Sequence, residues 1–241
     1  METAFVIAIV FIIVIIIVIF QGRNKRHDSD EILRRRQKDK ELLETVTTLD
    51  RGTGSEQLLI LMLLKHGISP QAIFHDLYVK TASGSYAQID LVVATKAGII
   101  VFEDKCYGGW IFGNGNQENW TQVLAHGQDK FRFYNPIKQN SRHIMHLQKL
   151  LGEKVPFYSV IVFNGNCVLK EITNVPNNTF VVQPQHVLDV VDEIMSYEPT
   201  TYKNKVKVAT LLKQAVENGK DAGIRAQHAE HVGSAKESHA Q

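Results

Sequence analysis

The sequence predicts an α/β fold with a mixed central sheet flanked by helices, preceded by one transmembrane helix. Three observations lead to this prediction. Residues 4–20 form an unbroken apolar run, residues 89–103 hold two short runs rich in Val and Ile, and residues 136–151 repeat apolar side chains at helical spacing. The first pattern is typical of a membrane span, the second of strands and the third of an amphipathic helix.

The chain divides into five expected segments, judged from composition and apolar periodicity. About 200 residues follow the apolar run, a length that one domain commonly has. The tail is rich in Ala, His, Lys and Gly without apolar periodicity, which favours disorder. The segments are a transmembrane anchor (1–22), a charged helical stalk (23–49), a soluble domain (50–198), a C-terminal helix (199–218) and a disordered tail (219–241).

The apolar run of residues 4–20 is expected to be a retained membrane anchor. It has seventeen residues, mostly Ile, Val and Phe, which is near the lower limit for crossing a bilayer. A buried globular helix would carry a polar face, and a signal peptide would have a basic start and a small-residue cleavage site. Arg23, Lys25 and Arg26 follow the run, so we expect a single-pass protein of the cell membrane whose domain faces the cytoplasm.

The helices and strands of the domain are expected in the following order. Ser55 is a candidate cap for a helix over Glu56–His66 whose apolar face would hold Leu58, Leu59, Met62 and Leu63. The Gly-rich segment Gly108–Asn116 predicts a turn or short hairpin, and it lacks the Gly-Lys-Ser/Thr of a phosphate loop. The remaining expected elements are strands over Phe74–Lys80, Ile89–Ala94, Gly98–Glu103, Phe157–Phe163 and Thr179–Val182, and helices over Asn135–Leu151, Gln185–Ser196 and Val206–Glu217.

Asp90 and the triplet Glu103-Asp104-Lys105 are the candidate catalytic residues. Thr95–Gly98 is short enough to close an antiparallel hairpin between their strands. Because strand side chains alternate, Glu103 and Lys105 should project to one side, with Asp90 roughly opposite and Asp104 pointing away. Two carboxylates and an ammonium can hold Mg²⁺ or Mn²⁺ and promote phosphodiester hydrolysis. A Glu-x-Lys triplet also occurs on solvated surfaces, so the pattern alone leaves both interpretations open.

Further motifs occur in a fixed order around these residues, over about residues 50–165. They are Gly52–Glu56, Gln88–Asp90, Gly98–Lys105, Tyr107, Gly109–Gly113, Trp120–Gln122, Phe133–Pro136, Gln139-Asn140 and His143. In this order the chain resembles the nuclease-related domain family, a branch of the PD-(D/E)xK nuclease superfamily. The resemblance implies that residues 50–198 form a nuclease-related domain with a restriction-endonuclease-like core.

The resemblance also implies roles for individual residues. Asp90 and Glu103 match the metal-binding carboxylates, and Lys105 matches the catalytic lysine. The implied activity is that of a membrane-anchored hydrolase, a nuclease that uses Mg²⁺ or Mn²⁺, with DNA favoured over RNA by family analogy. Glu56 from the first helix and the carbonyl of Asp104 are implied to complete the metal environment. Gln139, on a later helix, matches a polar position that borders the catalytic site.

A formal charge of only +2 does not by itself indicate nucleic-acid binding. The alternative is therefore a non-catalytic module, tethered to the membrane, that binds nucleic acid or a protein, and a third is a scaffold that assembles through the stalk. A local patch of basic and aromatic residues suits nucleic acid, although an amphipathic helix with a solvated face explains the same residues. The patch comprises Lys130, Phe131, Arg132, Phe133, Tyr134, Lys138, Arg142 and Lys149.

The remaining reactive side chains are assigned structural roles. Cys106 and Cys167 are too few for a disulfide framework and are expected as free thiols. Cys106 follows the candidate lysine, yet no base lies nearby in sequence, so a small buried residue is favoured over a nucleophile. His143 and His146 share a helix surface, but no Cys or acidic partner at matching spacing favours zinc.

Overall fold

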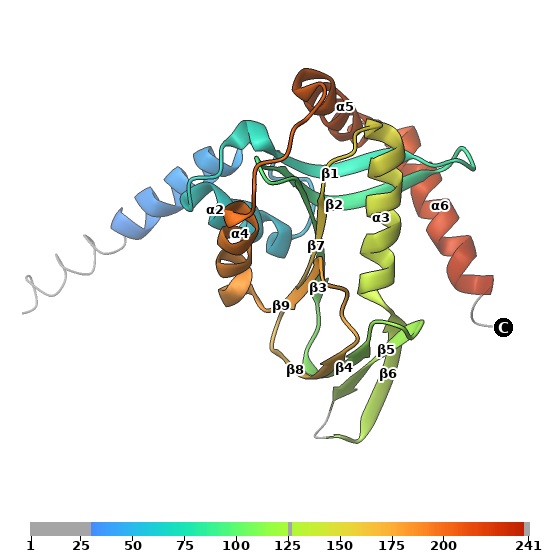
Figure 1. Ribbon diagram of the computed structural model, residues 1–241. Coiled ribbons are helices and arrows are strands. Elements are labelled where there is room, and N and C mark those ends of the chain that lie inside the picture. The colour runs from blue at the N-terminus through green and yellow to red at the C-terminus, as the bar shows by residue number, and fades with distance from the viewer. Residues whose placement is uncertain (1–29, 125–126, 239–241) are drawn as a thin grey trace, which may run out of the picture.

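Two mixed sheets and the helices packed against them make up the fold (Figure 1). The computed structural model describes residues 30–124 and 127–238. The predicted anchor at residues 4–20 lies outside these described residues. Among the helices that are described, none is both long and apolar enough to span a bilayer.

The larger sheet has five strands in the order β1-β2-β3-β7-β9. β1, β2 and β3 are antiparallel neighbours, while β7 runs parallel to β3 and β9 parallel to β7. The predicted hairpin is confirmed, because Ala94 pairs with Ile99 across the turn. The strands are β1 (Ile73–Lys80), β2 (Tyr86–Ala94), β3 (Ile99–Cys106), β7 (Phe157–Asn164) and β9 (Thr179–Val182).

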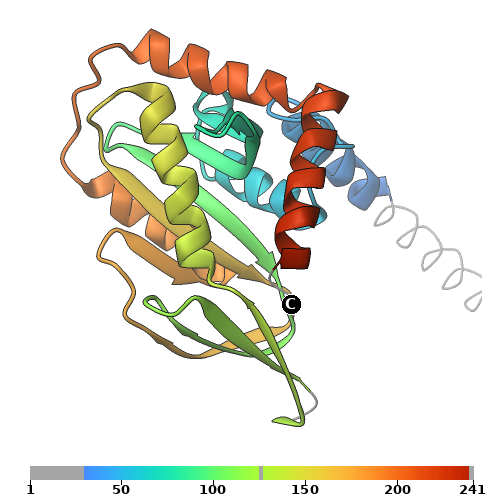
Figure 2. The same cartoon turned by 90° about the vertical axis from the view of Figure 1, so that its right-hand side faces the viewer.

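Helices cover both faces of this sheet (Figures 1 and 2). α2 (Gly54–Lys65) and α4 (Val187–Ser196) pack on one face, and α3 (Pro136–Leu151) and α5 (Lys205–Asn218) on the other. Strand β3 supplies both cores, since Ile100 and Phe102 face α2 whereas Ile99 and Val101 face α3. Burial on both faces explains why the strand reads as a continuous apolar run.

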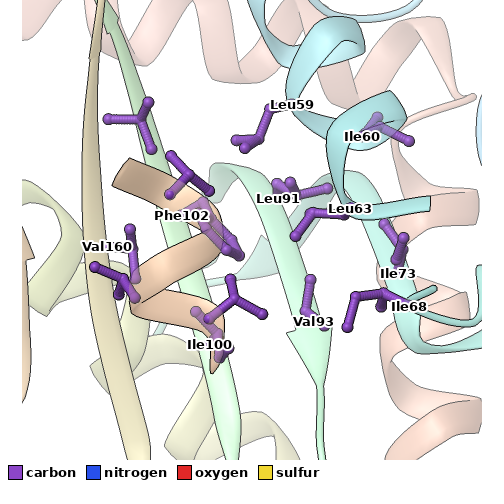
Figure 3. Packing of buried hydrophobic residues seen from close by; sticks show 14 of the residues in the cluster. Leu59, Ile60, Leu63, Ile68, Ile73, Leu91, Val93, Ile100, Phe102 and Val160 are labelled. Carbon is purple, nitrogen blue, oxygen red and sulfur yellow. The ribbon is translucent and has the colours of Figure 1, made fainter. Parts of the chain in front are cut away.

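The core beneath α2 shows how that helix is oriented (Figure 3). Leu59, Ile60 and Leu63 point to the sheet, while Leu58 is 63% exposed, so its predicted place in the apolar face is wrong. The helix begins two residues earlier than expected, because the hydroxyl of Thr53, and not that of Ser55, caps it by accepting the N–H of residue 56 at 3.2 Å.

A second, four-stranded sheet, called the arm below, has the order β6-β5-β4-β8. The predicted turn or short hairpin over Gly108–Asn116 is instead strand β4 with the start of a turn, and this strand pairs with β5; the other strands of the arm were not predicted. Residues 130–134 are a strand and not part of an amphipathic helix, because Phe131 and Phe133 alternate with charged residues at period two. The strands are β4 (Gly109–Asn114), β5 (Asn119–Leu124), β6 (Asp129–Tyr134) and β8 (Cys167–Thr173).

Aromatic packing holds the arm on the end of the larger sheet. Trp120 and Phe163 are both fully buried, and their rings stack at 5.9 Å with an interplanar angle of 4°. Gly113 lies under the indole, where a Cβ atom would come within 2.3 Å of the ring. A larger residue at position 113 would therefore separate the arm from its support.

The two ends of the described chain both pack on the domain. A helix over residues 30–43 buries Leu43 against α2, so the end of the predicted stalk belongs to the core. The predicted disorder of residues 219–241 is wrong for α6 (Ala222–Ser238). His228 on this helix packs its ring against Tyr78 at 5.6 Å and hydrogen bonds through Nδ1 to the Tyr86 carbonyl at 2.8 Å. Tertiary contacts thus hold α6 in place, although its sequence has no apolar stripe.

Asn135 joins the arm to α3 and provides a test of the fold. It is fully buried, its Oδ1 accepts the N–H of Ile137 at 2.9 Å, and its Nδ2 donates to the carbonyls of Asn114, Gly115 and Gln117. Asn135→Ala removes the cap and the amide that these three carbonyls share as a donor, although the Asn114 carbonyl still accepts the N–H groups of Trp120 and Gln117. We expect the free energy of unfolding, measured by urea denaturation, to fall by about 2–4 kcal/mol.

Two control variants separate these contributions. Asn135→Asp keeps the cap acceptor but loses the donors and should be at least as destabilising as Asn135→Ala, because a carboxylate would face three carbonyls. Asn116→Ala, on the exposed loop nearby, should change stability by less than about 0.5 kcal/mol. Equal effects at positions 116 and 135 would contradict this role for Asn135.

Candidate active site

The candidate site lies where β2 and β3 separate. Their ladder runs from the turn to the pair Leu91 and Phe102 and stops there, although β3 remains paired with β7 as far as Cys106. At the next position the Oδ2 atom of Asp90 accepts the N–H of Asp104 at 2.8 Å. A side-chain carboxylate thus replaces a backbone carbonyl in satisfying that N–H, and its position is fixed by the opening of the hairpin.

Glu103 and Lys105 form a buried ion pair on the α3 side of β3. The Oε1 atom of Glu103 contacts the Lys105 ammonium, and its Oε2 atom lies 3.2 Å from Nε2 of His143 on α3. Burial alone would raise the pKa of Glu103, but His143 and Lys105 outweigh it and lower that pKa. Burial likewise opposes the charge of Lys105, yet Glu103 and Asp90 raise the pKa of the amine. Both groups of the pair are therefore charged.

At Asp90, unlike at Glu103, the causes that raise the pKa outweigh those that lower it. Burial, followed by the negative charges of Glu103 and Glu56, raises the pKa of Asp90 well above its usual range. The N–H of Asp104 and the charge of Lys105 offset this only in part. Burial and the neighbouring carboxylates therefore both disfavour the charged form of Asp90.

Asp104 points to the other face of the sheet, as the alternation predicts. Its carboxylate accepts hydrogen bonds from the Ser55 hydroxyl at the start of α2 and from the Asn164 side-chain amide at the end of β7. Burial raises the pKa of Asp104, and these two hydrogen bonds oppose that rise. With its side chain engaged there, Asp104 has only its backbone carbonyl for a metal at the site.

Glu56 is buried, and both of its oxygens already have partners. Oε1 accepts a hydrogen bond from Thr53 at 2.9 Å, and Oε2 lies 2.9 Å from Nε2 of His75 on β1. The other ring nitrogen of His75 lies 2.7 Å from the Thr47 hydroxyl. The structure thus places Glu56 near the cluster, where its charge raises the pKa of Asp90, but as a link between α2 and β1.

Helix α3 forms the wall of the site opposite β3. The Nδ2 group of Asn140 donates to the Val101 carbonyl at 2.8 Å and to the Ser159 hydroxyl at 2.9 Å, which fixes the helix on two strands. Gln139 and His143 are four residues apart and so share one surface of α3. The contact with Glu103 brings His143 into the site, a role that the motif order did not assign to it.

A second buried ion pair near the site was not predicted. Asp76 on β1 has a φ of +54° and is 5% exposed, and its carboxylate accepts hydrogen bonds from Arg51 and Gln88 at 2.9 Å. Gly52 follows the arginine with a φ of +70°, and a Cβ there would come within 2.4 Å of the His75 ring. A single Asp within an apolar strand gives no sequence signal for this local distortion.

The donor set of the site fits a hard divalent cation. Across the described residues, no three His, Cys, Asp or Glu side chains are grouped as a metal site. Mg²⁺, however, commonly binds one or two carboxylates and completes its shell with water and substrate phosphate. Asp90 and Glu103 supply two carboxylates, and the buried Oε2 of Glu103 has no hydrogen-bond partner with acceptable geometry. Burial, and then the charges of Glu103 and Glu56, raise the pKa of Asp90, and a cation beside its carboxylate would oppose that rise.

The two cysteines are free, as expected, but Cys106 is exposed at the end of β3. The prediction that Cys106 is buried is wrong, because β2 has already left this edge of β3. Cys167 is buried in the arm. His146 lies one turn beyond His143, and burial, with the charge of His143, lowers the pKa of His146.

The fold and the cluster together define a class: an α/β domain that presents two carboxylates and a lysine at the opening of a β-hairpin. Residues 51–164 match the family model of the nuclease-related domain. An uncharacterized protein of Bacillus anthracis is 34% identical over 122 residues, which are 51% of this chain and 57% of that relative. The chain thus covers little more than half the length of that protein. No solved structure matches the chain.

The raised pKa of Asp90 predicts a specific pH dependence of stability. Because the pKa is higher in the folded than in the unfolded protein, stability is highest below the unfolded value of about 4 and is lost as pH rises through the folded pKa. Asp90→Asn keeps an oxygen to accept the Asp104 N–H and removes the charge. We expect the variant to be more stable than the wild type at pH 7 in urea denaturation with EDTA, and similar in stability at pH 4.

An exposed carboxyl provides the control. Glu198→Gln should leave the pH profile unchanged, since this residue follows α4 on the surface. A wild-type protein whose stability relative to Asp90→Asn does not change between pH 4 and pH 7 would show that Asp90 titrates normally.

Proposed function

We propose that this protein is a membrane-anchored nuclease that hydrolyses phosphodiester bonds, with DNA as the favoured substrate, using Mg²⁺ or Mn²⁺. One observation carries the proposal: Asp90, Glu103 and Lys105 meet at the opening between β2 and β3, within a domain that matches the nuclease-related family. The mixed sheet with helices on both faces is compatible with the PD-(D/E)xK core that the resemblance implies.

In this proposal each residue of the cluster has a separate task. Asp90 and Glu103 hold the cation, with the Asp104 carbonyl as a further ligand. A bound Mg²⁺ or Mn²⁺ supplies charge neutralisation at the phosphate and acidifies water. Lys105 is kept protonated by Glu103 and places its ammonium where it can orient the attacking water or stabilise the negative charge that develops on phosphate.

Two further residues support the site in the same proposal. Glu56 adds negative charge behind the metal ligands while His75 and Thr53 hold it in place. Gln139 lies on the α3 surface that also carries His143, and it borders the space in which substrate would bind. Neither residue needs to contact the reacting atoms for the cluster to work.

The membrane location belongs to the proposal as well. Residues 4–20 are the proposed anchor, and the basic residues that follow it place the domain in the cytoplasm. Nine residues, 21–29, lie between the proposed anchor and the first residue that the structure describes.

Cleavage assays test the proposed chemistry. The full chain in detergent would be incubated with single-stranded, duplex and branched DNA and with RNA, in Mg²⁺, Mn²⁺ or EDTA. We expect metal-dependent cleavage by the wild type and a loss of about 100-fold or more in Glu103→Ala and Lys105→Ala, because each removes a group that acts on the transition state. Glu198→Ala and Lys213→Ala remove the same residue types from exposed positions and should cut normally.

Circular dichroism of every variant would show that the fold is retained. A folded wild type that cuts none of these substrates, or Glu103→Ala and Lys105→Ala variants that cut as fast as the wild type, would contradict the proposal. In either case a membrane-tethered binding module would be the better explanation.

A further inference from the structure

A row of aromatic side chains starts at Phe163 on β7, the strand next to the one that carries Lys105. In the parallel pairing of β3 and β7, Lys105 is the register partner of Phe163, so both side chains lie on the α3 face of the sheet. Phe163 stacks on Trp120 of the arm and has Tyr107 at a ring distance of 6.1 Å. The arm therefore borders the proposed catalytic cluster with an aromatic surface.

This aromatic surface continues outward along β6. The rings of Tyr107 and Phe133 stack at 4.4 Å with an interplanar angle of 28°. Phe131 lies two residues from Phe133 on the same strand, so it is on the same face, and it is 52% exposed. The row is thus buried where it meets the larger sheet and exposed at Phe131, whose ring can accept a further aromatic partner.

The segment that carries the exposed end of this row is basic, although Lys130 and Arg132, the neighbours of Phe131 in β6, project to the opposite face of the strand. Residues 129–151, which include β6 and α3, contain five Lys or Arg and one Asp, a net charge of +4, whereas the whole chain carries +2. One of these cations, Arg142 on α3, lies 5.0 Å from the centre of the Tyr134 ring. Basic groups attract phosphates and aromatic rings stack on bases, which is the combination that single-stranded nucleic-acid sites use.

We infer that Phe131 binds an unpaired nucleotide of the substrate by stacking of a base on its ring, and that the basic residues of the same edge strand, Lys130 and Arg132, attract the phosphates of the bound nucleic acid. The inference rests on the proposed nuclease function and specifies its substrate class: single-stranded nucleic acid, or a strand with unpaired bases. A base within a duplex already stacks on both neighbours, so its face is closed to the ring. An unpaired base has no such restriction.

The opposite face of the arm provides a matched comparison. Trp110 is 37% exposed and is adjacent in β4 to Ile111, which is fully buried on the inner face, so Trp110 projects outward. The ammonium of Lys170 lies 5.0 Å from the centre of the Trp110 ring. Trp110 is therefore an exposed aromatic residue of the same arm that faces away from the row formed by Phe163, Tyr107 and Phe133.

Binding without cleavage tests the inference. The full chain carrying Glu103→Gln, in detergent with EDTA, would be titrated with a single-stranded oligonucleotide containing 2-aminopurine and with the matching duplex. We expect tighter binding of the single strand, with 2-aminopurine fluorescence quenched by stacking. Phe131→Ala should weaken single-strand binding about tenfold and abolish the quenching, Phe131→Tyr should restore both, and Trp110→Ala should change neither.

Several outcomes would overturn the inference. These are unchanged binding and quenching in Phe131→Ala, equal losses in Phe131→Ala and Trp110→Ala, or duplex binding as tight as single-strand binding. The titration uses neither metal nor turnover, so its result is separate from the cleavage assay. If the wild type cuts nothing yet binds single strands through Phe131, the nuclease function fails while the stacking site stands.

Discussion

The pairing of Glu103 with Lys105 at the end of a fully buried strand is the constraint on which the site depends. β3 fills both cores with Ile99 to Phe102, and the next residues bring charge into the same buried environment. A buried carboxylate needs a partner, because desolvation costs more than most single interactions return. Lys105 and His143 supply that compensation, and they also keep Glu103 ionised.

The departure of β2 from β3 converts an ordinary hairpin into a site. If the ladder continued, Asp90 would pair directly with Glu103. The strands would then leave no space between them in which solvent or substrate could reach the two carboxylates. Because the strands part after Leu91, the Asp90 side chain takes over the N–H that the ladder leaves behind. One local geometric change thus satisfies a backbone donor and opens a space lined by two carboxylates.

The elements that follow from local pattern could be predicted, and those that follow from tertiary contact could not. The hairpin, the position of Asp90 and the Asn135 start of α3 were predicted by β-branched runs, alternation and Asn-Pro chemistry. The buried face of α2 was not, because residues 58–64 are apolar throughout and periodicity selects no side. The arm strands mix exposed and buried residues over six or seven positions. The partners of Glu56 come from β1 and the loop before α2, which no spacing indicates.

The arm and the cluster are one continuous piece of structure. The chain segments that pair as β3 and β7 pair again as β4 and β8, and the N–H groups of Tyr107 and Gly109 continue the hydrogen bonding across the junction at 3.1 and 3.0 Å. No free linker therefore separates Lys105 from the aromatic row. If the proposed function holds, a nucleic-acid strand bound on the arm would lie at a fixed distance from the carboxylates, so binding energy at the arm could position the reacting phosphate. The same continuity would let a chain of small net charge bind nucleic acid beside the proposed catalytic groups.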